Sequence, residues 1–104
     1  MTNKEVVELE ASRVRFFSQN DESAFFDWLK KIDCIEKYEG RGEMIYLTVS
    51  TKAMTEDYLR ELLSVFRRYE ISMRQLSIFD RKQFSTWFRD KRAYWYVSVF
   101  EEYT

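Results

Sequence analysis

The side chains that most often do chemistry in enzymes are scarce in this sequence. There is no histidine and only one cysteine, Cys34, among the 104 residues. Without histidine, neither a Ser–His nor a Cys–His nucleophile pair can form. Cys34 stands beside an apolar segment with no basic cluster near it in the sequence, which is typical of a buried structural thiol. The only two glycines lie in Gly40-Arg-Gly42, a turn sequence and not a phosphate-binding loop.

Neighbouring carboxylates are the remaining candidates for acid–base chemistry or for binding a divalent metal ion. They form four pairs: Glu8/Glu10, Asp21/Glu22, Glu56/Asp57 and Glu101/Glu102. Two of the pairs stand where helices are expected to begin, and negative charge there suits the helix dipole. The other two lie near the ends of the chain, where solvated carboxylates are common. We therefore expect a protein that is not an enzyme and that binds neither a metal nor a cofactor.

Length and composition are typical of one small domain, spanning residues 1–104. Charged residues make up 34% of the chain and nearly cancel, with a net charge of −1. The first ten residues, MTNKEVVELE, contain no apolar signal segment, and the apolar runs are too short to span a bilayer. The sequence therefore predicts a cytoplasmic protein without a membrane partner.

Hydrophobic spacing predicts an α/β fold. Apolar residues at helical spacing predict one helix from Asn20 or Asp21 to about Ile32, and another from the cap Thr55 to about Tyr69. Alternating and β-forming residues predict strands within 6–17, 34–39, 43–50, 73–79 and 93–100. A short helix is expected after Asp80, whose spacing from Gln83 matches a capping box. The first six elements, β-α-β-β-α-β, match the split βαβ or ferredoxin-like arrangement, with a mostly antiparallel sheet and both helices on one face.

The alternation also assigns side chains to the two faces of that sheet. Its phase changes near Ser12, which predicts either a bulge or a strand that begins only there. The side predicted to face the helices carries Val14, Phe16, Ile45, Leu47, Val49, Leu76, Ile78, Trp95, Val97 and Val99. The other side carries Arg13, Arg15, Tyr46, Thr48, Gln75, Ser77, Tyr94, Tyr96 and Ser98. This polar and aromatic composition is typical of a face covered by water or by a partner.

A small regulatory or nucleic-acid-binding module is the alternative. Residues 67–92 hold eight Arg or Lys against three Asp or Glu, with aromatic residues between them. Basic and aromatic side chains together can bind single-stranded nucleic acid, and the predicted order resembles the RRM arrangement. However, the strand MIYLTVS lacks the Gly-aromatic-Gly/Ala-Phe sequence of that family.

The resemblance to a known family rests on three segments and a following WF: FFSQNDESAFFDWLKKI, EMIYLTVS and LRELLSVFRRYEISMRQLSIF. Together they resemble small bacterial immunity proteins that neutralise secreted or contact-delivered toxins. The resemblance implies a cytoplasmic, non-enzymatic protein that binds one cognate toxin, and immunity proteins often use acidic surfaces against nuclease toxins. Residues 1–43 carry ten acidic and seven basic side chains, so an acidic surface is expected there. The predicted partner-binding residues are Arg13, Arg15, Tyr46, Tyr94 and Tyr96 on the sheet face, and Asp21, Glu22, Asp27, Glu36, Glu39 and Glu43 on the acidic flank.

Overall fold

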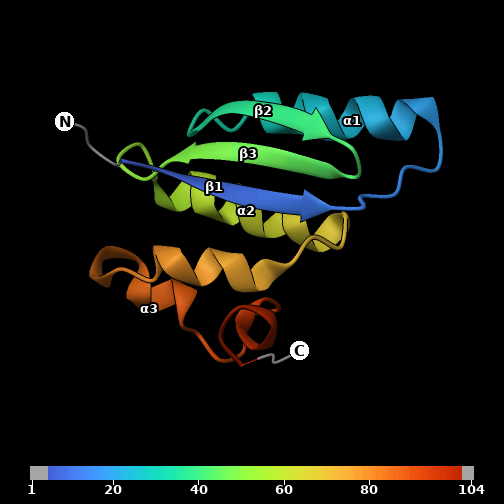
Figure 1. Ribbon diagram of the computed structural model, residues 1–104. Coiled ribbons are helices and arrows are strands. Elements are labelled where there is room, and N and C mark those ends of the chain that lie inside the picture. The colour runs from blue at the N-terminus through green and yellow to red at the C-terminus, as the bar shows by residue number, and fades with distance from the viewer. Residues whose placement is uncertain (1–4, 102–104) are drawn as a thin grey trace. The chain divides into compact units, whose positions relative to one another are not determined.

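The computed structural model describes residues 5–101. The chain divides into two compact units, an N-terminal unit, Met1–Ile71, and a C-terminal unit, Ser72–Thr104. The N-terminal unit contains β1 (Val6–Ser12), α1 (Gln19–Lys30), β2 (Ile35–Arg41), β3 (Met44–Ser50) and α2 (Glu56–Arg68) (Figure 1). The C-terminal unit contains a 3-10 helix (Met73–Phe79), a 3-10 turn (Lys82–Phe84), α3 (Ser85–Phe88) and a π-helix (Val97–Glu101). The fold is therefore mixed α and β.

The sheet has three strands in the order β1-β3-β2, and both pairings are antiparallel. β1 and β2 thus run parallel to each other with β3 between them, which is a split βαβ unit. Gly42, with φ +63°, makes the tight turn between β2 and β3. Figure 1 shows α1 and α2 on one face of the sheet, as the sequence predicts, and leaves the other face without a helix from this unit.

Alternate residues of the strands form the core beneath the helices. Leu9 pairs with Leu47 and Val7 with Val49, and Leu9, Leu47 and Val49 are buried. The prediction for Leu47 and Val49 is confirmed. α2 contributes an apolar stripe to the same unit, with Leu59, Leu62, Leu63, Val65 and Phe66 buried.

The first strand is shorter than predicted. The residues facing the helices are Val7, Leu9 and Ala11, and the strand ends at Ser12, before Val14 and Phe16. Arg13 adopts a positive φ of 54°, and this turn of the backbone accounts for the change of phase. Phe16 nevertheless packs inward, with its ring centre 5.4 Å from that of Phe25.

Side-chain caps fix where the two long helices begin. Thr55 caps α2 by accepting a hydrogen bond from the backbone N–H of Tyr58 (3.1 Å), as predicted. α1 begins earlier than predicted, because Ser18 is its cap and accepts from the N–H of Asp21 (3.1 Å). Such caps satisfy N–H groups that have no partner within the helix.

The predicted strand at 73–79 is wrong, since this segment is a 3-10 helix. Its buried residues, Met73, Leu76 and Phe79, recur every third position, which matches the three residues per turn of a 3-10 helix. Ile78, predicted to face the core, is 53% exposed. The sixth element of a ferredoxin-like fold is therefore not a strand, and the full arrangement is not confirmed.

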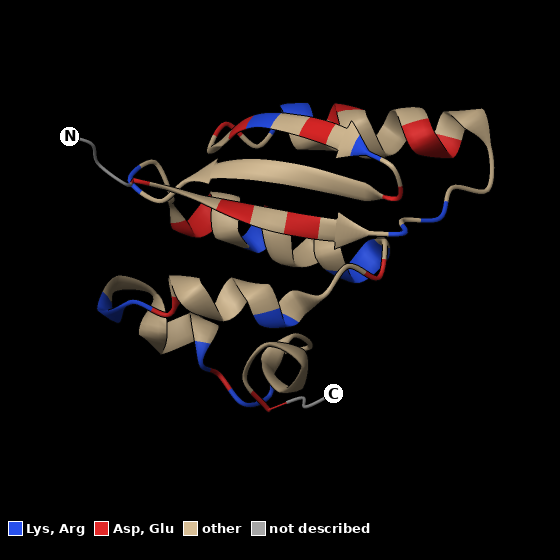
Figure 2. Ribbon diagram, in the orientation of Figure 1, with Lys and Arg blue, Asp and Glu red and all other residues tan. Residues whose placement is uncertain are grey.

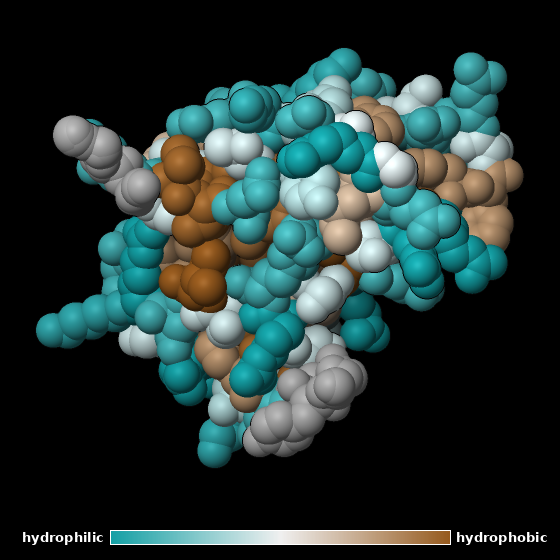
Figure 3. All heavy atoms as spheres, viewed as in Figure 1, coloured by the Kyte–Doolittle hydropathy of each residue, from teal (hydrophilic) through white to brown (hydrophobic). Residues whose placement is uncertain are grey.

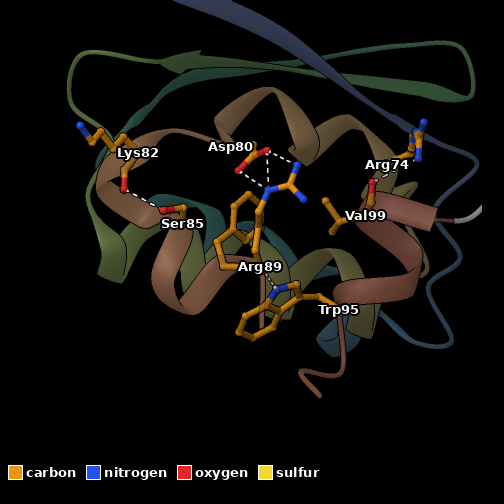
Figure 4. A network of polar contacts seen from close by, with 8 residues as sticks. Arg74, Asp80, Lys82, Ser85, Arg89, Trp95 and Val99 are labelled. Atoms are coloured by element: carbon orange, nitrogen blue, oxygen red, sulfur yellow. Dashed lines mark hydrogen bonds and ion pairs between the residues drawn. The ribbon is translucent and has the colours of Figure 1, made fainter. Parts of the chain in front are cut away.

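The predicted strand at 93–100 is also wrong. Residues 91–95 form turns, and Val97–Glu101 is a π-helix. Trp95, Tyr96 and Val99 are buried whereas Val97 is exposed, so the inward side chains do not alternate. The indole N–H of Trp95 donates to the carbonyl oxygen of Phe88 (2.8 Å), which ties this segment to α3 (Figure 4).

An ion pair joins Asp80 to Arg89 within the C-terminal unit. The guanidinium of Arg89 donates to both carboxylate oxygens of Asp80, with Nε–Oδ1 at 3.1 Å and Nη2–Oδ2 at 2.5 Å (Figure 4). The same guanidinium lies 4.6 Å from the ring centre of Phe100. Asp80 therefore does not form the predicted capping box. The short helix predicted after it is present as Lys82–Phe84 and Ser85–Phe88.

Candidate binding surfaces

The first candidate surface is the face of the sheet opposite α1 and α2, which we call the open sheet face. The register places on it β1 residues Glu8 and Glu10, β2 residues Lys37, Glu39 and Arg41, and β3 residues Met44, Tyr46 and Thr48. The charged members are exposed and the three β3 residues are half-buried. Three carboxylates and two basic groups thus surround an uncharged central strand.

Tyr46 occupies the middle of the open sheet face. It pairs with Glu10 on one side and with Glu39 on the other. The guanidinium of Arg41 lies over its ring, with the carbon 4.1 Å from the ring centre, and that guanidinium also approaches Glu39 (3.8 Å). Because tyrosine and arginine often contribute most of the binding energy of interfaces, this stacked pair is a candidate anchor. The predicted orientation of Tyr46, away from the helices, is confirmed.

Charge and hydropathy across this face follow the strands. Figure 2 shows acidic bands along β1, mixed charge along β2 and none along β3. Figure 3 shows a largely hydrophilic surface over the sheet, with hydrophobic atoms gathered near the start of β1. Val6, at that start, is 43% exposed. The open sheet face is therefore acidic at the β1 edge.

The second candidate surface is a cavity of about 260 Å³, which we call the arginine cavity. It lies where β1 ends and α2 ends, and its lining residues are Arg13, Arg15, Phe17, Asp21, Arg68, Tyr69 and Glu70. Arg13 and Arg15 therefore do not lie on the sheet face as predicted, because the strand stops at Ser12. The cavity brings them together with Asp21, a predicted residue from the acidic set.

Hydrogen bonds hold one wall of the arginine cavity. Asp21 accepts from the hydroxyl of Tyr69 at Oδ1 (3.1 Å) and from the backbone N–H of Phe17 at Oδ2 (3.0 Å). Desolvation, and then the hydrogen bond to Asp21, raise the pKa of Tyr69 above its ordinary value. Tyr69 therefore keeps its proton at neutral pH and serves as a donor.

Two residues with unusual backbone geometry line this cavity. Among residues 5–101, the non-glycine residues with positive φ are Arg13 (54°) and Glu70 (58°), and both line it. Glu70 follows α2 in a Schellman arrangement, because the N–H of Ile71 donates to Phe66 O (2.9 Å) and its own N–H to Arg67 O (3.4 Å). Arg13 is held by its N–H to Glu43 O (2.8 Å) and by an ion pair to the Glu43 carboxylate (2.8 Å).

The other predicted partner-binding residues are not among those that line the cavity or that the register places on the open sheet face. Tyr94 and Tyr96 are not on the sheet, since their segment forms no strand, and Tyr96 is only 7% exposed. The remaining acidic residues are all exposed: Glu22 and Asp27 on α1, Glu36 on β2 and Glu43 in the β2–β3 turn. Within the N-terminal unit, the predicted acidic residues are therefore spread over α1, β2, the β2–β3 turn and the arginine cavity.

Asp27 lines a groove between α1 and α2, of about 730 Å³. Trp28 donates from its indole nitrogen to Glu61 (2.8 Å), and the Tyr58 hydroxyl donates to Asp33 (3.1 Å). The hydrogen bond to Asp33, and secondarily desolvation, raise the pKa of Tyr58. These bonds link α1 and its following turn to α2, so the groove residues already have partners within the fold.

Sequence reasoning missed four residues of the arginine cavity: Phe17, Arg68, Tyr69 and Glu70. The sequence predicts Tyr69 only as the end of a helix. No local pattern links Tyr69 to Asp21, 48 positions earlier. The sequence carries one signal for the cavity: Phe17 is a large apolar residue at the end of the first predicted strand, but it does not fit the alternation of that strand.

Chemically, both surfaces offer charge and hydrogen bonds. Cys34 is fully buried, as predicted, and desolvation raises its pKa to about 11, so it stays a thiol. Among residues 5–101 no group of three or more His, Cys, Asp or Glu side chains could hold a metal ion. No helix in that range is both long and apolar enough to cross a membrane.

Comparisons with protein-family models, with curated proteins and with solved structures gave no match to this chain.

Proposed function

We propose that this chain is a non-enzymatic binding protein that neutralises a cognate bacterial toxin in the cytoplasm, with the open sheet face as its contact surface. The observation that carries the proposal is that α1 and α2 cover one face of the sheet and leave Tyr46, stacked with Arg41, at the centre of the other. The resemblance of the sequence to immunity proteins supplies the class of partner. A nuclease toxin with a basic surface would complement Glu8, Glu10 and Glu39.

The proposed contact has energetic requirements that this face could meet. Nanomolar affinity corresponds to about 12 kcal/mol of binding free energy, and a few desolvated aromatic or arginine side chains usually supply most of it. Tyr46 and Arg41 are placed for that role, because their neighbours on both sides are charged and can form a polar rim. The carboxylates would mainly speed association with a basic partner.

The test takes any protein encoded directly beside the gene as the candidate toxin and scores growth of cells that express both proteins. Tyr46→Ala should abolish protection and weaken binding by at least tenfold, whereas Tyr94→Ala is the matched control. Tyr94 is 49% exposed and lies outside the sheet, so its loss should change neither. Circular dichroism checks that both variants fold.

A charge reversal separates steering from anchoring. The double variant Glu10→Lys/Glu39→Lys should slow association while changing dissociation little, because charges at the edge of an interface mainly guide the encounter. If Tyr46→Ala and the double variant both protect like the parent, the open sheet face is not the contact surface. If no neighbouring toxin is bound by the parent chain, the immunity function itself is refuted.

Nucleic-acid binding remains the alternative function. Three aromatic residues of its basic segment are poorly placed for base stacking, since Phe79, Phe84 and Phe88 are buried. Arg89 is also held by Asp80. A gel shift with single-stranded RNA and DNA across salt concentrations tests this function. Tight binding that weakens steeply with salt would favour it over toxin neutralisation.

A further inference from the structure

We propose that the arginine cavity is a binding site for an oxyanion, a phosphate or carboxylate group carried on a small apolar ligand. This site is separate from the open sheet face. Its charged lining comes from two distant parts of the chain, the segment after β1 and the end of α2. Folding therefore builds a cluster of guanidinium groups that neither segment has alone.

The guanidinium groups of Arg13, Arg15 and Arg68 supply the positive charge. A guanidinium presents five N–H donors in a planar fork that matches the oxygens of phosphate and carboxylate. Within residues 5–101 the one ion pair that engages these arginines is that of Arg13 Nε with Glu43, which leaves the two terminal nitrogens of Arg13 to donate elsewhere. The cavity is therefore well supplied with donors for an oxyanion.

The two carboxylates in the lining do not cancel this charge. Three arginines face Asp21 and Glu70, which leaves one net positive charge in the lining. Asp21 is further occupied, because each of its oxygens already accepts a hydrogen bond, from Tyr69 and from Phe17. An arriving anion thus meets guanidinium donors, while one of the two carboxylates in the lining already accepts hydrogen bonds within the fold.

Phe17 supplies an apolar wall. Phe17 lines the cavity and is 82% exposed, so most of its ring is open to solvent. The guanidinium carbon of Arg15 lies 5.6 Å from the centre of its ring, so a charged donor and an aromatic surface stand together. A ligand with an oxyanion next to a ring or short hydrocarbon would contact both.

The size of the cavity limits the ligand. Its volume of about 260 Å³ lies just below the ~300–1,000 Å³ typical of pockets for drug-sized molecules. One oxyanion with a small carrier fits this volume better than a large cofactor does. Phenyl phosphate and benzoate are therefore suitable probes, with inorganic phosphate as the probe that lacks the apolar carrier.

The test is a nuclear magnetic resonance titration of the full chain that follows the arginine side-chain N–H signals at constant ionic strength. Phenyl phosphate should cause saturable shifts in Arg13, Arg15 and Arg68, and should bind several-fold more tightly than inorganic phosphate. Phe17→Ala should remove that difference. Whichever of phenyl phosphate and benzoate binds more tightly then identifies the oxyanion that the site prefers.

Arg67 and Arg68 provide a matched pair of variants. They are neighbours in the last turn of α2 and both are exposed, but only Arg68 lines the cavity. Arg68→Gln should weaken phenyl phosphate binding at least tenfold, and Arg67→Gln should change it less than twofold. Shifts that never saturate, or equal losses in the two variants, would show a general effect of surface charge and overturn the proposal. Both residues lie off the sheet, so this outcome is independent of the proposed toxin binding.

Discussion

Replacing Glu70 by glycine should stabilise the protein. Glu70 has a φ of +58° and stands at the position after α2 where the Schellman motif usually has glycine. A side chain in this left-handed conformation costs about 1–2 kcal/mol. Glycine loses more backbone entropy on folding, about 0.5–1 kcal/mol, which cancels part of the gain. We therefore expect Glu70→Gly to raise the free energy of unfolding by about 0.5–1 kcal/mol.

Urea denaturation followed by circular dichroism measures this change, with agreement between probes as the check for two-state unfolding. For a chain of this size, each kcal/mol corresponds to a shift in Tm of about 4–8 °C. Glu70→Ala is the control, because it removes the same carboxylate but keeps a side chain at positive φ. If Glu70→Gly is no more stable than Glu70→Ala, backbone strain at this position is not the cause. Both variants should bind phenyl phosphate more tightly than the parent, since both remove a negative charge from the cavity.

Three further predictions concern other residues of the N-terminal unit. Phe25→Ala should lower the free energy of unfolding by about 3–5 kcal/mol, because Phe25 is fully buried and its ring centre lies 4.8 Å from that of Tyr69; an unchanged denaturation midpoint would contradict this packing. The pKa of Cys34 rises from 9.0 to about 11 on folding, so the thiol of the unfolded state ionises first. The contribution of Cys34 to the free energy of unfolding should therefore be constant below pH 9 and fall between pH 9 and 11. The measurement compares the parent with Cys34→Ala across pH, and two parallel curves of stability against pH would refute the prediction. Glu43→Gln should leave the denaturation midpoint unchanged, because the side chains of Arg13 and Glu43 are 79% and 75% exposed and surface ion pairs contribute little to stability. A clear loss of stability would show that the ion pair holds the backbone of the cavity in place.

The sequence predicted the N-terminal unit well because the spacing of apolar residues differs clearly between its helices and its strands. The stripe of α2 and its cap Thr55 are local signals, and so is the alternation that sets Leu47 and Tyr46 on opposite faces. The C-terminal unit was harder to predict. Gln75 to Ile78 alternates over too few positions to separate a strand from a 3-10 helix, although the spacing of Met73, Leu76 and Phe79 carried the period of three.

The prediction of a strand at 93–100 was wrong for another reason. Its β-branched and aromatic residues favour a strand, but such preferences depend on packing against neighbouring strands. Here Trp95 bonds to Phe88 and no strand forms. The arginine cavity could be predicted only in part. The alternation predicts Arg13 on the sheet face and charge predicts Asp21 on the acidic flank, whereas their proximity depends on a turn at Arg13 and on a contact across 48 positions.

The position of β1 at the edge of the sheet has a consequence for solubility. Within residues 5–101 no strand pairs with its outer side. Since Arg13 N–H and Glu5 C=O bond toward β3, the alternating pattern turns the backbone groups of Glu8 and Glu10 outward. An edge like this can recruit the same strand of a second molecule, and charged side chains are a common defence. Glu8 and Glu10 thus keep like-charged copies apart, and a chain with glutamine at both positions should stack edge to edge and precipitate at lower concentration.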